Sequence, residues 1–380
     1  MKALWLLPTQ ETSNLMESYR LALIEKNVEL SFFHMRELTL SSDIETCRRK
    51  ILESVSDYDF VIVTMFPDTI ELSHKFLYKL CKSKQLVLVA FDEELYFSWS
   101  THYYIRYFDH VLTTDKSSIN WIHDQGISVS YVPLYNMTGH DTNIVSDKRD
   151  IDVLFIGSAL TGSRRHQIEQ LESQGFKIDC FGDGTKNGRI SENEYWKLLY
   201  RAKIVLNFTE ANAKPYLLRS DPSRKYVRQA KGRPFEALLC GAHVLSERSS
   251  ILSDALYESK GVTFVDDMGN SGKQIKYLID QIKKGDRKKY KKYVIKNFGI
   301  DQFIYELIGF INNQRQPCID SSRPVDNYSL GYGGFLSRVY MRLAKQSLKN
   351  SNFLGSFVLI QEYFRLKLYR YIWEAITLRR

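Results

Sequence analysis

Basic and acidic side chains gather in one short run of the chain, from Lys231 to Gly241, whose residue types could bind an anion. Pro234 suits the first turn of a helix and Gly241 suits its end, so a helix is predicted between them. Lys231 and Arg233 would flank the amino end of this helix, and free amides with positive side chains there attract a diphosphate. Glu236 would lie in the first turn. It could accept hydrogen bonds from a ribose diol, or it could simply favour the helix dipole.

A second candidate site follows the apolar run at 151–156. Gly157 and Ser158 form a small-residue turn, and Arg164 and Arg165 come at the start of the next predicted helix. Free backbone amides beside two arginines could contact phosphate oxygens. The competing interpretation is an ordinary turn followed by two solvated arginines, because short glycine motifs often occur by chance.

A third polar run follows the apolar segment at 176–181. Gly182, Asp183 and Gly184 end this predicted strand, and Arg189 follows in a loop. Taken alone, the run indicates a turn. The three runs together have the order and spacing expected of a sugar-nucleotide site.

These residues need a sheet that brings strand ends together, and the sequence predicts two such sheets. Short apolar runs alternate with segments of helical period, which indicates parallel strands covered on both faces. The predicted strands lie at 3–7, 28–33, 60–66, 86–91, 110–113 and 129–132, then at 151–156, 176–181, 203–208, 243–246 and 262–265. We therefore expect an α/β chain with two tandem Rossmann-like, doubly wound domains, 1–140 and 150–312, joined by a polar segment. Open sheets of this kind bind ligands at the carboxyl ends of their strands.

Acidic residues at one strand end of the first domain are the candidates for catalysis. Asp92 and Glu93 follow a predicted strand, and adjacent side chains diverge, so only one of them should act as a base. A helix cap or a surface ion pair explains them equally well. Asp57 and Asp59 have the spacing of a metal-binding pair but precede a strand, which places them at the opposite edge, so no metal site is expected.

Composition and charge exclude several classes of protein. The chain has 380 residues, 44% of them hydrophobic, which excludes a disordered protein, and no apolar run is long enough to span a membrane. Five scattered cysteines argue against a disulfide framework and favour the cytoplasm. Neither a zinc-finger nor an RNP-type motif is present, and no nucleic-acid partner is expected.

The last part of the chain carries most of the net charge. Residues 328–380 hold nine Lys or Arg and two acids, a net charge of +7 out of +9, together with 11 aromatic residues. They predict basic helices that bind an anionic membrane surface, placing the protein at the inner face of the membrane. The alternative is that the apolar stripe of Leu336, Val339, Tyr340 and Leu343 packs onto the first domain.

The second domain resembles the donor domain of GT-B glycosyltransferases, and is closest to the CgeB-like branch related to glycosyltransferase family 4. The residues that carry the resemblance are 153–158, 181–184, 194–196, 202–207 and 232–242, with weaker support from 89–93, 107–118 and 131–134. The similarity covers about residues 1–310, and the F-E-A-L-x-C-G core at 235–241 is its most specific part.

The resemblance implies transfer of a sugar from a nucleotide-sugar co-substrate without an essential metal or other cofactor. It places Glu236 on the donor ribose, Lys231 with Arg164 or Arg165 on the diphosphate, and the loop at 188–190 near the base. One position departs from the family. Family 4 enzymes usually have a second glutamate eight positions before the ribose-binding one, and here that position is Arg228.

Together these features predict a metal-independent, hexosyltransferase-like enzyme that acts on a glycan or lipid-linked acceptor, in glycan or cell-surface polysaccharide synthesis. The alternative is a non-catalytic protein that binds a sugar nucleotide or a glycan on the same scaffold, which the arginine at position 228 would permit.

Overall fold

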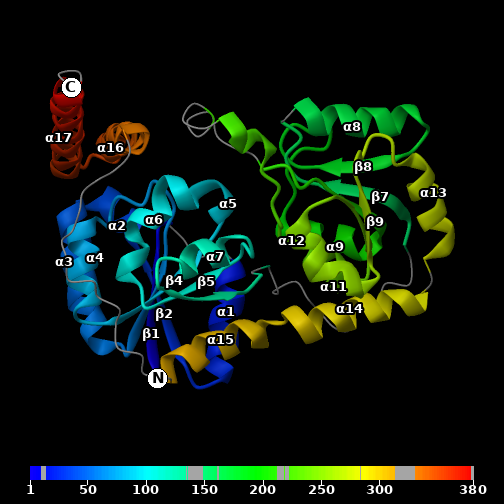
Figure 1. Ribbon diagram of the computed structural model, residues 1–380, viewed down its shortest axis with the longest axis horizontal. Coiled ribbons are helices and arrows are strands. Elements are labelled where there is room, and N and C mark those ends of the chain that lie inside the picture. The colour runs from blue at the N-terminus through cyan, green and yellow to red at the C-terminus, as the bar shows by residue number, and fades with distance from the viewer. Residues whose placement is uncertain are drawn as a thin grey trace. The chain divides into compact units, whose positions relative to one another are not determined.

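The computed structural model describes residues 1–9, 14–133, 135, 149–160, 162–211, 218, 222–282, 284–312 and 330–377. It contains two parallel sheets with helices on their faces (Figure 1). The chain divides into two compact units. The first consists mainly of Met1–Val132 and Ile304–Arg380, and the second mainly of Pro133–Ala213 and Ser223–Phe303. The polar segment predicted to join the domains lies largely outside the described residues.

Six parallel strands form the sheet of the first unit, in the order β2-β1-β3-β4-β5-β6. Their bounds are β1 Lys2–Leu7, β2 Glu29–His34, β3 Phe60–Thr64, β4 Gln85–Ala90, β5 His110–Thr113 and β6 Ser128–Tyr131. Every residue of β3 and β5 is buried, as expected for parallel strands covered on both faces. The strand order reverses between β1 and β3.

Helices connect these strands. They are α1 Asn14–Glu25, α2 Met35–Ser41, α3 Ile44–Ser54, α4 His74–Cys81, α5 Glu93–Tyr96, α6 His102–Tyr104 and α7 Ser118–His123. Two of them have side-chain caps: Asp43 accepts a hydrogen bond from the Thr46 amide, and Ser73 accepts one from Phe76. Such caps satisfy amides that the first helical turn leaves without a partner.

Five parallel strands form the second sheet, in the order β11-β10-β9-β7-β8. The strands are β7 Ile151–Ile156, β8 Ile178–Phe181, β9 Ala202–Asn207, β10 His243–Glu247 and β11 Val262–Val265. The helices are α8 Gly162–Ser173, α9 Glu192–Arg201, α11 Arg233–Leu239, α12 Ser250–Leu256, α13 Gly272–Gln281 and α14 Lys284–Phe298. One hydrophobic cluster is centred on Leu154, Val205 and Val244, and another on Phe155, Ile204 and Leu245. Neighbouring residues of a strand point to opposite faces, so both faces of the sheet are covered.

The predicted class, two doubly wound α/β domains with a helical extension, is confirmed. In the second sheet the strand order reverses between β7 and β9, and ligands of such sheets bind beside that point, at the carboxyl ends of the strands. The ends of β7, β8 and β9 are therefore the first place to look for a site.

Three helices end the chain: α15 Ile300–Asn312, α16 Leu330–Lys349 and α17 Phe353–Thr377. α16 and α17 pack against one another and against α2, and α17 also contacts α3 (Figure 1). The apolar stripe of Leu336, Val339, Tyr340 and Leu343 is buried, so packing explains it. This stripe is not free to enter a membrane.

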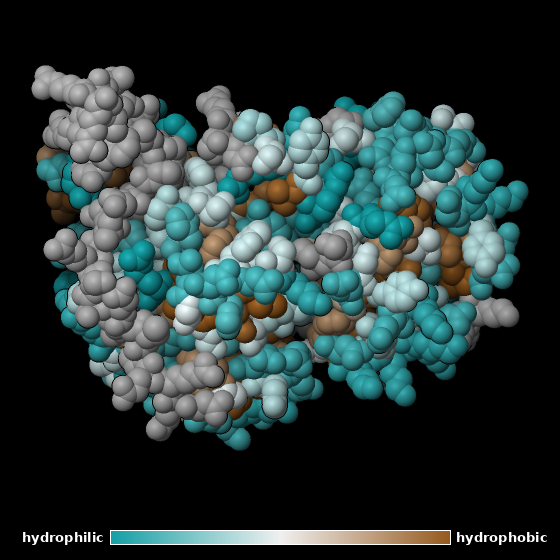
Figure 2. Space-filling view, viewed as in Figure 1, coloured by the Kyte–Doolittle hydropathy of each residue, from teal (hydrophilic) through white to brown (hydrophobic). Residues whose placement is uncertain are grey.

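The described basic residues of α16 and α17 lie at the surface, since each of Arg338, Arg342, Lys345, Lys349, Arg365 and Lys367 is exposed. The visible face around α14 is hydrophilic, as expected for a helix with six lysines in its sequence (Figure 2). Within the described part of the chain, no helix is both long enough and apolar enough to cross a bilayer.

Candidate functional site

The ends of β7 and β8 approach each other through two glycines. The Gly157 amide donates to the Phe181 carbonyl at 2.8 Å, and the Gly182 amide donates to the Gly188 carbonyl at 2.6 Å. A Cβ atom on Gly182 would lie 2.7 Å from the Gly157 carbonyl carbon, and Gly182 has a φ of +117°. Only glycine fits both the close approach and the backbone conformation here. The two predicted glycine runs therefore form one surface.

Arg233 lies against this surface. A Cβ atom on Gly157 would be 3.0 Å from Nη2 and 3.1 Å from Nη1 of Arg233, so the guanidinium covers the glycine directly. Its Nε is buried and has no hydrogen-bond partner among the described residues. A buried guanidinium N–H of this kind can donate a hydrogen bond to an added oxygen ligand. α11 has only seven residues, so the cation rather than the helix dipole dominates the electrostatics.

Lys231 and Arg164 brace the strand ends. Lys231 Nζ donates to the carbonyls of Phe208 and Glu210 at 3.2 and 3.0 Å. Arg164 is buried and donates to the carbonyls of Ser158 and Glu210, the former at 3.1 Å. Burial lowers the pKa of the Arg164 guanidinium. The structure thus places both cations and Ser158 beside the predicted site, and their contact with a diphosphate stays a prediction.

Glu236 is held by a side chain that the sequence analysis did not assign. The Tyr195 hydroxyl, on α9, donates to the Glu236 carboxylate. Burial, and then the charge of Glu236, raises the pKa of Tyr195, so the tyrosine remains a donor at neutral pH. This bond fixes the direction of the carboxylate. The tyrosine belongs to the stretch at 194–196 that carries the family resemblance, which was the available signal.

The remaining predicted residues lie around the loop after β8, with Asp183 and Arg189 in the loop itself and Arg165 on α8. Asp183 and Arg189 form a two-bond ion pair at 2.6 and 2.8 Å, and Arg189 lowers the pKa of Asp183. Arg165 donates to the Gly184 carbonyl at 3.1 Å and lines a cavity of about 350 Å³ with Lys186. These residues shape the loop after β8 rather than the surface beneath Arg233.

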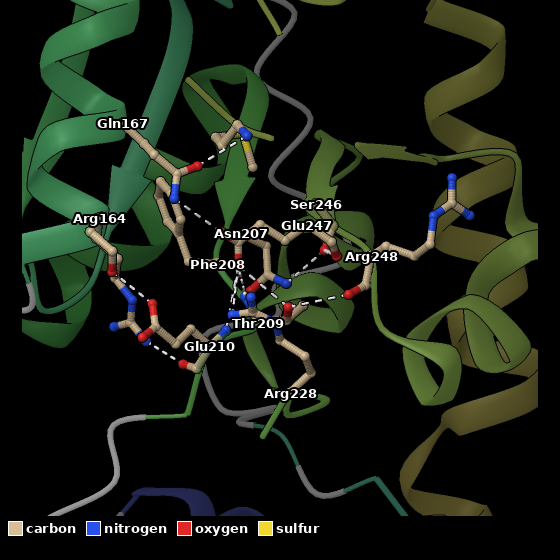
Figure 3. A network of polar contacts seen from close by, with 12 residues as sticks. Arg164, Gln167, Asn207, Phe208, Thr209, Glu210, Arg228, Ser246, Glu247 and Arg248 are labelled. Atoms are coloured by element: carbon tan, nitrogen blue, oxygen red, sulfur yellow. Dashed lines mark hydrogen bonds and ion pairs between the residues drawn. The ribbon is translucent and has the colours of Figure 1, made fainter. Parts of the chain in front are cut away.

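A polar network joins the ends of β9 and β10 (Figure 3). Glu247 is buried and accepts from the Thr209 amide at 2.9 Å and from Gln167 at 3.3 Å. Arg228, at the position where family 4 enzymes usually have glutamate, lies 3.8 Å from Glu247. Glu210 pairs with Arg228 as a β-bridge and accepts from Ser163. Sequence reasoning missed Glu247, although it ends the apolar strand β10, much as Asp92 and Glu93 follow β4.

In the first unit, the acids after β4 are placed differently from one another. Asp92 is exposed and has a left-handed backbone conformation, with a φ of +56°. Glu93 is only 2% exposed and accepts from Thr101 at 3.0 Å. Burial raises the pKa of Glu93 to about 8, and burial also raises that of Glu94 and Asp115. Glu93 therefore faces the interior as a neutral acid at neutral pH, whereas Asp92 faces solvent, and a catalytic role for either stays a prediction.

The acidic pair at 57–59 lies where the sequence placed it. The Lys2 amide, at the start of β1, donates to Asp59 at 2.7 Å, so this carboxylate is at the amino end of the sheet. Among the described residues, no group of three or more His, Cys, Asp or Glu side chains is arranged to hold a metal ion. The four described cysteines, Cys47, Cys81, Cys180 and Cys240, are free and buried.

Comparisons with known proteins agree with this geometry. Residues 164–292 match the family model described as glycosyl transferase-like. The structure of HepE from Anabaena in complex with UDP-glucose is similar with a TM-score of 0.54 and 13% identity, covering 82% of this chain and 100% of that one. AviGT4, a glycosyltransferase involved in avilamycin A biosynthesis, is similar with a TM-score of 0.55 and 10% identity, covering 82% and 97%. At these identities the likeness establishes the fold. No curated protein sequence matches the chain.

Proposed function

We propose that the chain, which has a GT-B-like fold and matches the glycosyl transferase-like family model at residues 164–292, transfers a sugar from a nucleotide-sugar donor to an acceptor hydroxyl. The observation that carries the proposal is the guanidinium of Arg233 over Gly157, at the point where the strand order reverses. A glycine at this position lets a diphosphate approach the backbone, and the cation above it matches the ligand's charge.

The proposed chemistry is displacement of a nucleoside diphosphate by the acceptor oxygen. The bond from the sugar's anomeric carbon to the diphosphate breaks as the bond to the acceptor forms, and negative charge grows on the departing group. Arg233 would stabilise that charge, with Lys231 and Arg164 nearby holding the loop carbonyls in place. Glu236, oriented by Tyr195, would accept hydrogen bonds from the ribose and so hold the donor in register.

The most informative first probe is UDP, because HepE, which shares this fold, has been solved with UDP and with UDP-glucose. We further propose a hexosyl donor and an acceptor on a glycan or lipid-linked glycan, at the cytoplasmic face of a membrane. The basic residues of the terminal helices favour such a location.

The test is a screen of nucleotide sugars for turnover, with UDP affinity measured by calorimetry on the full chain. Arg233→Ala should weaken UDP binding by a factor of about 10 to 100, since charge-assisted hydrogen bonds contribute about 1.5–3 kcal/mol. Arg201→Ala is the matched control. That arginine pairs with Asp150 on the surface at 2.9 Å, so its loss should leave UDP affinity unchanged. Equal loss in both variants would contradict the proposed site.

A non-catalytic binding protein is the second candidate, and the observation that favours it is Arg228 at the usual glutamate position, 3.8 Å from Glu247. The two functions give different results in one assay. A transferase releases UDP from one of the donors when an acceptor, or water, is supplied. A binding protein shows UDP affinity that depends on Arg233 but no release from any donor.

Metal independence is a separate part of the proposal. Arg233 lies over Gly157 and Arg164 donates to the Ser158 carbonyl, and we propose that these cations neutralise a diphosphate without a bound metal ion. Turnover, once a donor is found, should therefore be unchanged by excess EDTA. Loss of activity on chelation that Mn²⁺ or Mg²⁺ restores would show that a metal takes part.

A further inference from the structure

A basic groove lies between the two terminal helices. It has a volume of about 730 Å³. The residues that line it are Arg338, Met341, Arg342, Lys345, Gln346 and Lys349 of α16 and Tyr363 of α17. Its four cations follow one another at spacings of four, three and four residues, which places them on one face of α16. We call this surface the basic groove.

Most of this charge has no internal partner. Arg342 forms an ion pair with Asp68 at 2.8 Å, which fastens α16 to the first unit. Arg338, Lys345 and Lys349 are exposed and have no ion pair among the described residues. Glu362, next to Tyr363 on α17, pairs with Arg365 at 2.8 Å. The basic groove therefore presents three uncompensated positive charges to solvent.

Large apolar side chains are exposed on the same pair of helices. Phe353, Leu354, Phe357 and Phe364, all on α17, are 73%, 70%, 57% and 60% exposed. We call these four residues the apolar patch. The Phe364 ring contacts the ring of Tyr363, which lines the basic groove, with 5.2 Å between centroids. The apolar patch is thus continuous with the basic groove.

The rest of this helical pair is already occupied. The opposite stripe of α16, which includes Leu336 and Leu343, is buried, and Asn352 in the turn between the helices donates to the carbonyls of Leu40 and Ser42. The pair is therefore anchored to the first unit by one side. Its free side combines cations with aromatic rings, which is the combination found at membrane interfaces.

We propose that the basic groove and the apolar patch form a docking surface for an anionic membrane. Lipid phosphates would pair with Arg338, Lys345 and Lys349, and the rings of the apolar patch would lie at the boundary between headgroups and acyl chains. The inference goes beyond sugar transfer, because it depends on a surface of the first unit and not on the donor site. The sequence had suggested the apolar stripe of α16 for the membrane contact, but that stripe is buried. The proposal assigns the apolar part of the contact to the exposed residues of α17 instead.

Vesicle flotation of the full chain tests the proposal. The wild type should float with vesicles of mixed phosphatidylglycerol and phosphatidylcholine at low salt, and not with pure phosphatidylcholine. Replacing Arg338, Lys345 and Lys349 with glutamine should lower partitioning about 100-fold, because each cation near an anionic surface contributes about a factor of five. Lys288, Lys292 and Lys296, exposed on α14, form a matched control when changed in the same way. The control should float as the wild type does.

The apolar patch is tested by the double variant Phe357→Ser with Phe364→Ser. The control is Tyr257→Ser, because Tyr257 is 77% exposed and lies outside the helical pair. The double variant should partition less than the wild type at both low and high salt, and Tyr257→Ser should partition as the wild type does. Unchanged melting temperatures show that the helices stay folded. Equal loss in the α14 variant would overturn the proposal, as would equal flotation with neutral vesicles. Binding of duplex DNA without any flotation would also overturn it and would point to nucleic acid.

Discussion

The carboxyl ends of the two sheets carry opposite chemistry on the same architecture. Both sheets are parallel, and in both the strand order reverses beside the first strand. The second sheet ends in glycines covered by arginine, at Gly157, Gly182 and Arg233. The first sheet ends near buried acids, among them Glu93, whose pKa is raised by burial and by the charges of Asp115 and Asp92. The edge of the second sheet thus carries a cation, and the edge of the first sheet carries a buried carboxyl with a raised pKa.

This difference shows what the fold determines and what it leaves to single residues. Parallel pairing brings the strand ends of a sheet to one edge, and it does so in both units. The charge of that edge then depends on the two or three residues that follow each strand. Donor binding can be proposed for the second unit because its edge combines close backbone approach with a cation.

At the carboxyl edge of the second sheet, we expect Gly182→Ala to have the largest effect on stability. A Cβ atom there would overlap the Gly157 backbone, and alanine is strained at a φ of +117°. We expect a loss of about 4 kcal/mol in the free energy of unfolding, measured by urea denaturation. Gly175→Ala is the control, since it has a φ of +91° with nothing within 4 Å, and it should lose about 1 kcal/mol. Equal losses would show that backbone strain alone explains the glycine.

The first edge is tested by pH. The pKa of Glu93 is raised from an ordinary 4.5 to about 8, so in this window the folded chain keeps a proton that the unfolded chain has lost. The contribution of Glu93 to stability is therefore fully present below pH 4.5 and is lost as the pH rises towards 8. Glu93→Gln should reduce this fall by on the order of 3 kcal/mol, measured by urea denaturation at both ends of the window.

The control for Glu93→Gln is Glu53→Gln on α3, whose side chain is 59% exposed. It should leave the pH dependence unchanged. Part of the fall should remain in Glu93→Gln, because Glu94 and Asp115 also have raised pKa values. A variant with the full pH dependence of the wild type would show that Glu93 is ionised in the folded chain.

Much of the fold could be predicted from the sequence, for a physical reason. Most strands of these parallel sheets are largely apolar, so each of the eleven was visible as a run, and 110–113, 151–156 and 262–265 were predicted with their observed bounds. The packing of α16 was left open between two alternatives. An apolar stripe is the same in sequence whether a lipid or another helix covers it.

The candidate site was less predictable, because contacts between distant strand ends leave no local pattern. Gly157, Gly182 and Arg233 were each selected, but their meeting was not visible from spacing alone. Arg164 was selected as a phosphate ligand, whereas the structure buries it on two carbonyls. Tyr195 lies in the stretch 194–196 that carries the resemblance, but its partner Glu236 is 41 residues away in the sequence. Its role depends on α9 packing near α11, which only the fold provides.

A smaller effect is expected from Glu236→Gln, which tests the second edge as a binding surface. Glutamine can still accept the Tyr195 hydroxyl, so the fold should persist, but charge-assisted bonds to a ribose would be lost. We expect UDP affinity to fall by about 1.5–3 kcal/mol in calorimetry. Tyr195→Phe keeps the Glu236 carboxylate and removes only the hydrogen bond that orients it. The affinity of this variant for UDP should therefore fall less. Unchanged affinity in Glu236→Gln, with a normal melting curve, would remove Glu236 from the proposed site.

Arg228→Gln should have the smallest effect on stability. It tests the arginine beside Glu247, the buried glutamate of the second sheet that corresponds to Glu93 in the first. Glu247 follows the pattern of Glu93 but accepts the Thr209 amide at 2.9 Å and has Arg228 at 3.8 Å. The Arg228 side chain is 45% exposed, so water screens this pair and its loss should cost less than about 1 kcal/mol in unfolding free energy. Glu247→Gln, which weakens a buried charged acceptor, should cost about 2 kcal/mol. If the two variants are equally destabilised, Arg228 stabilises the polar network that joins the ends of β9 and β10. Its presence at the usual glutamate position then has a structural cause.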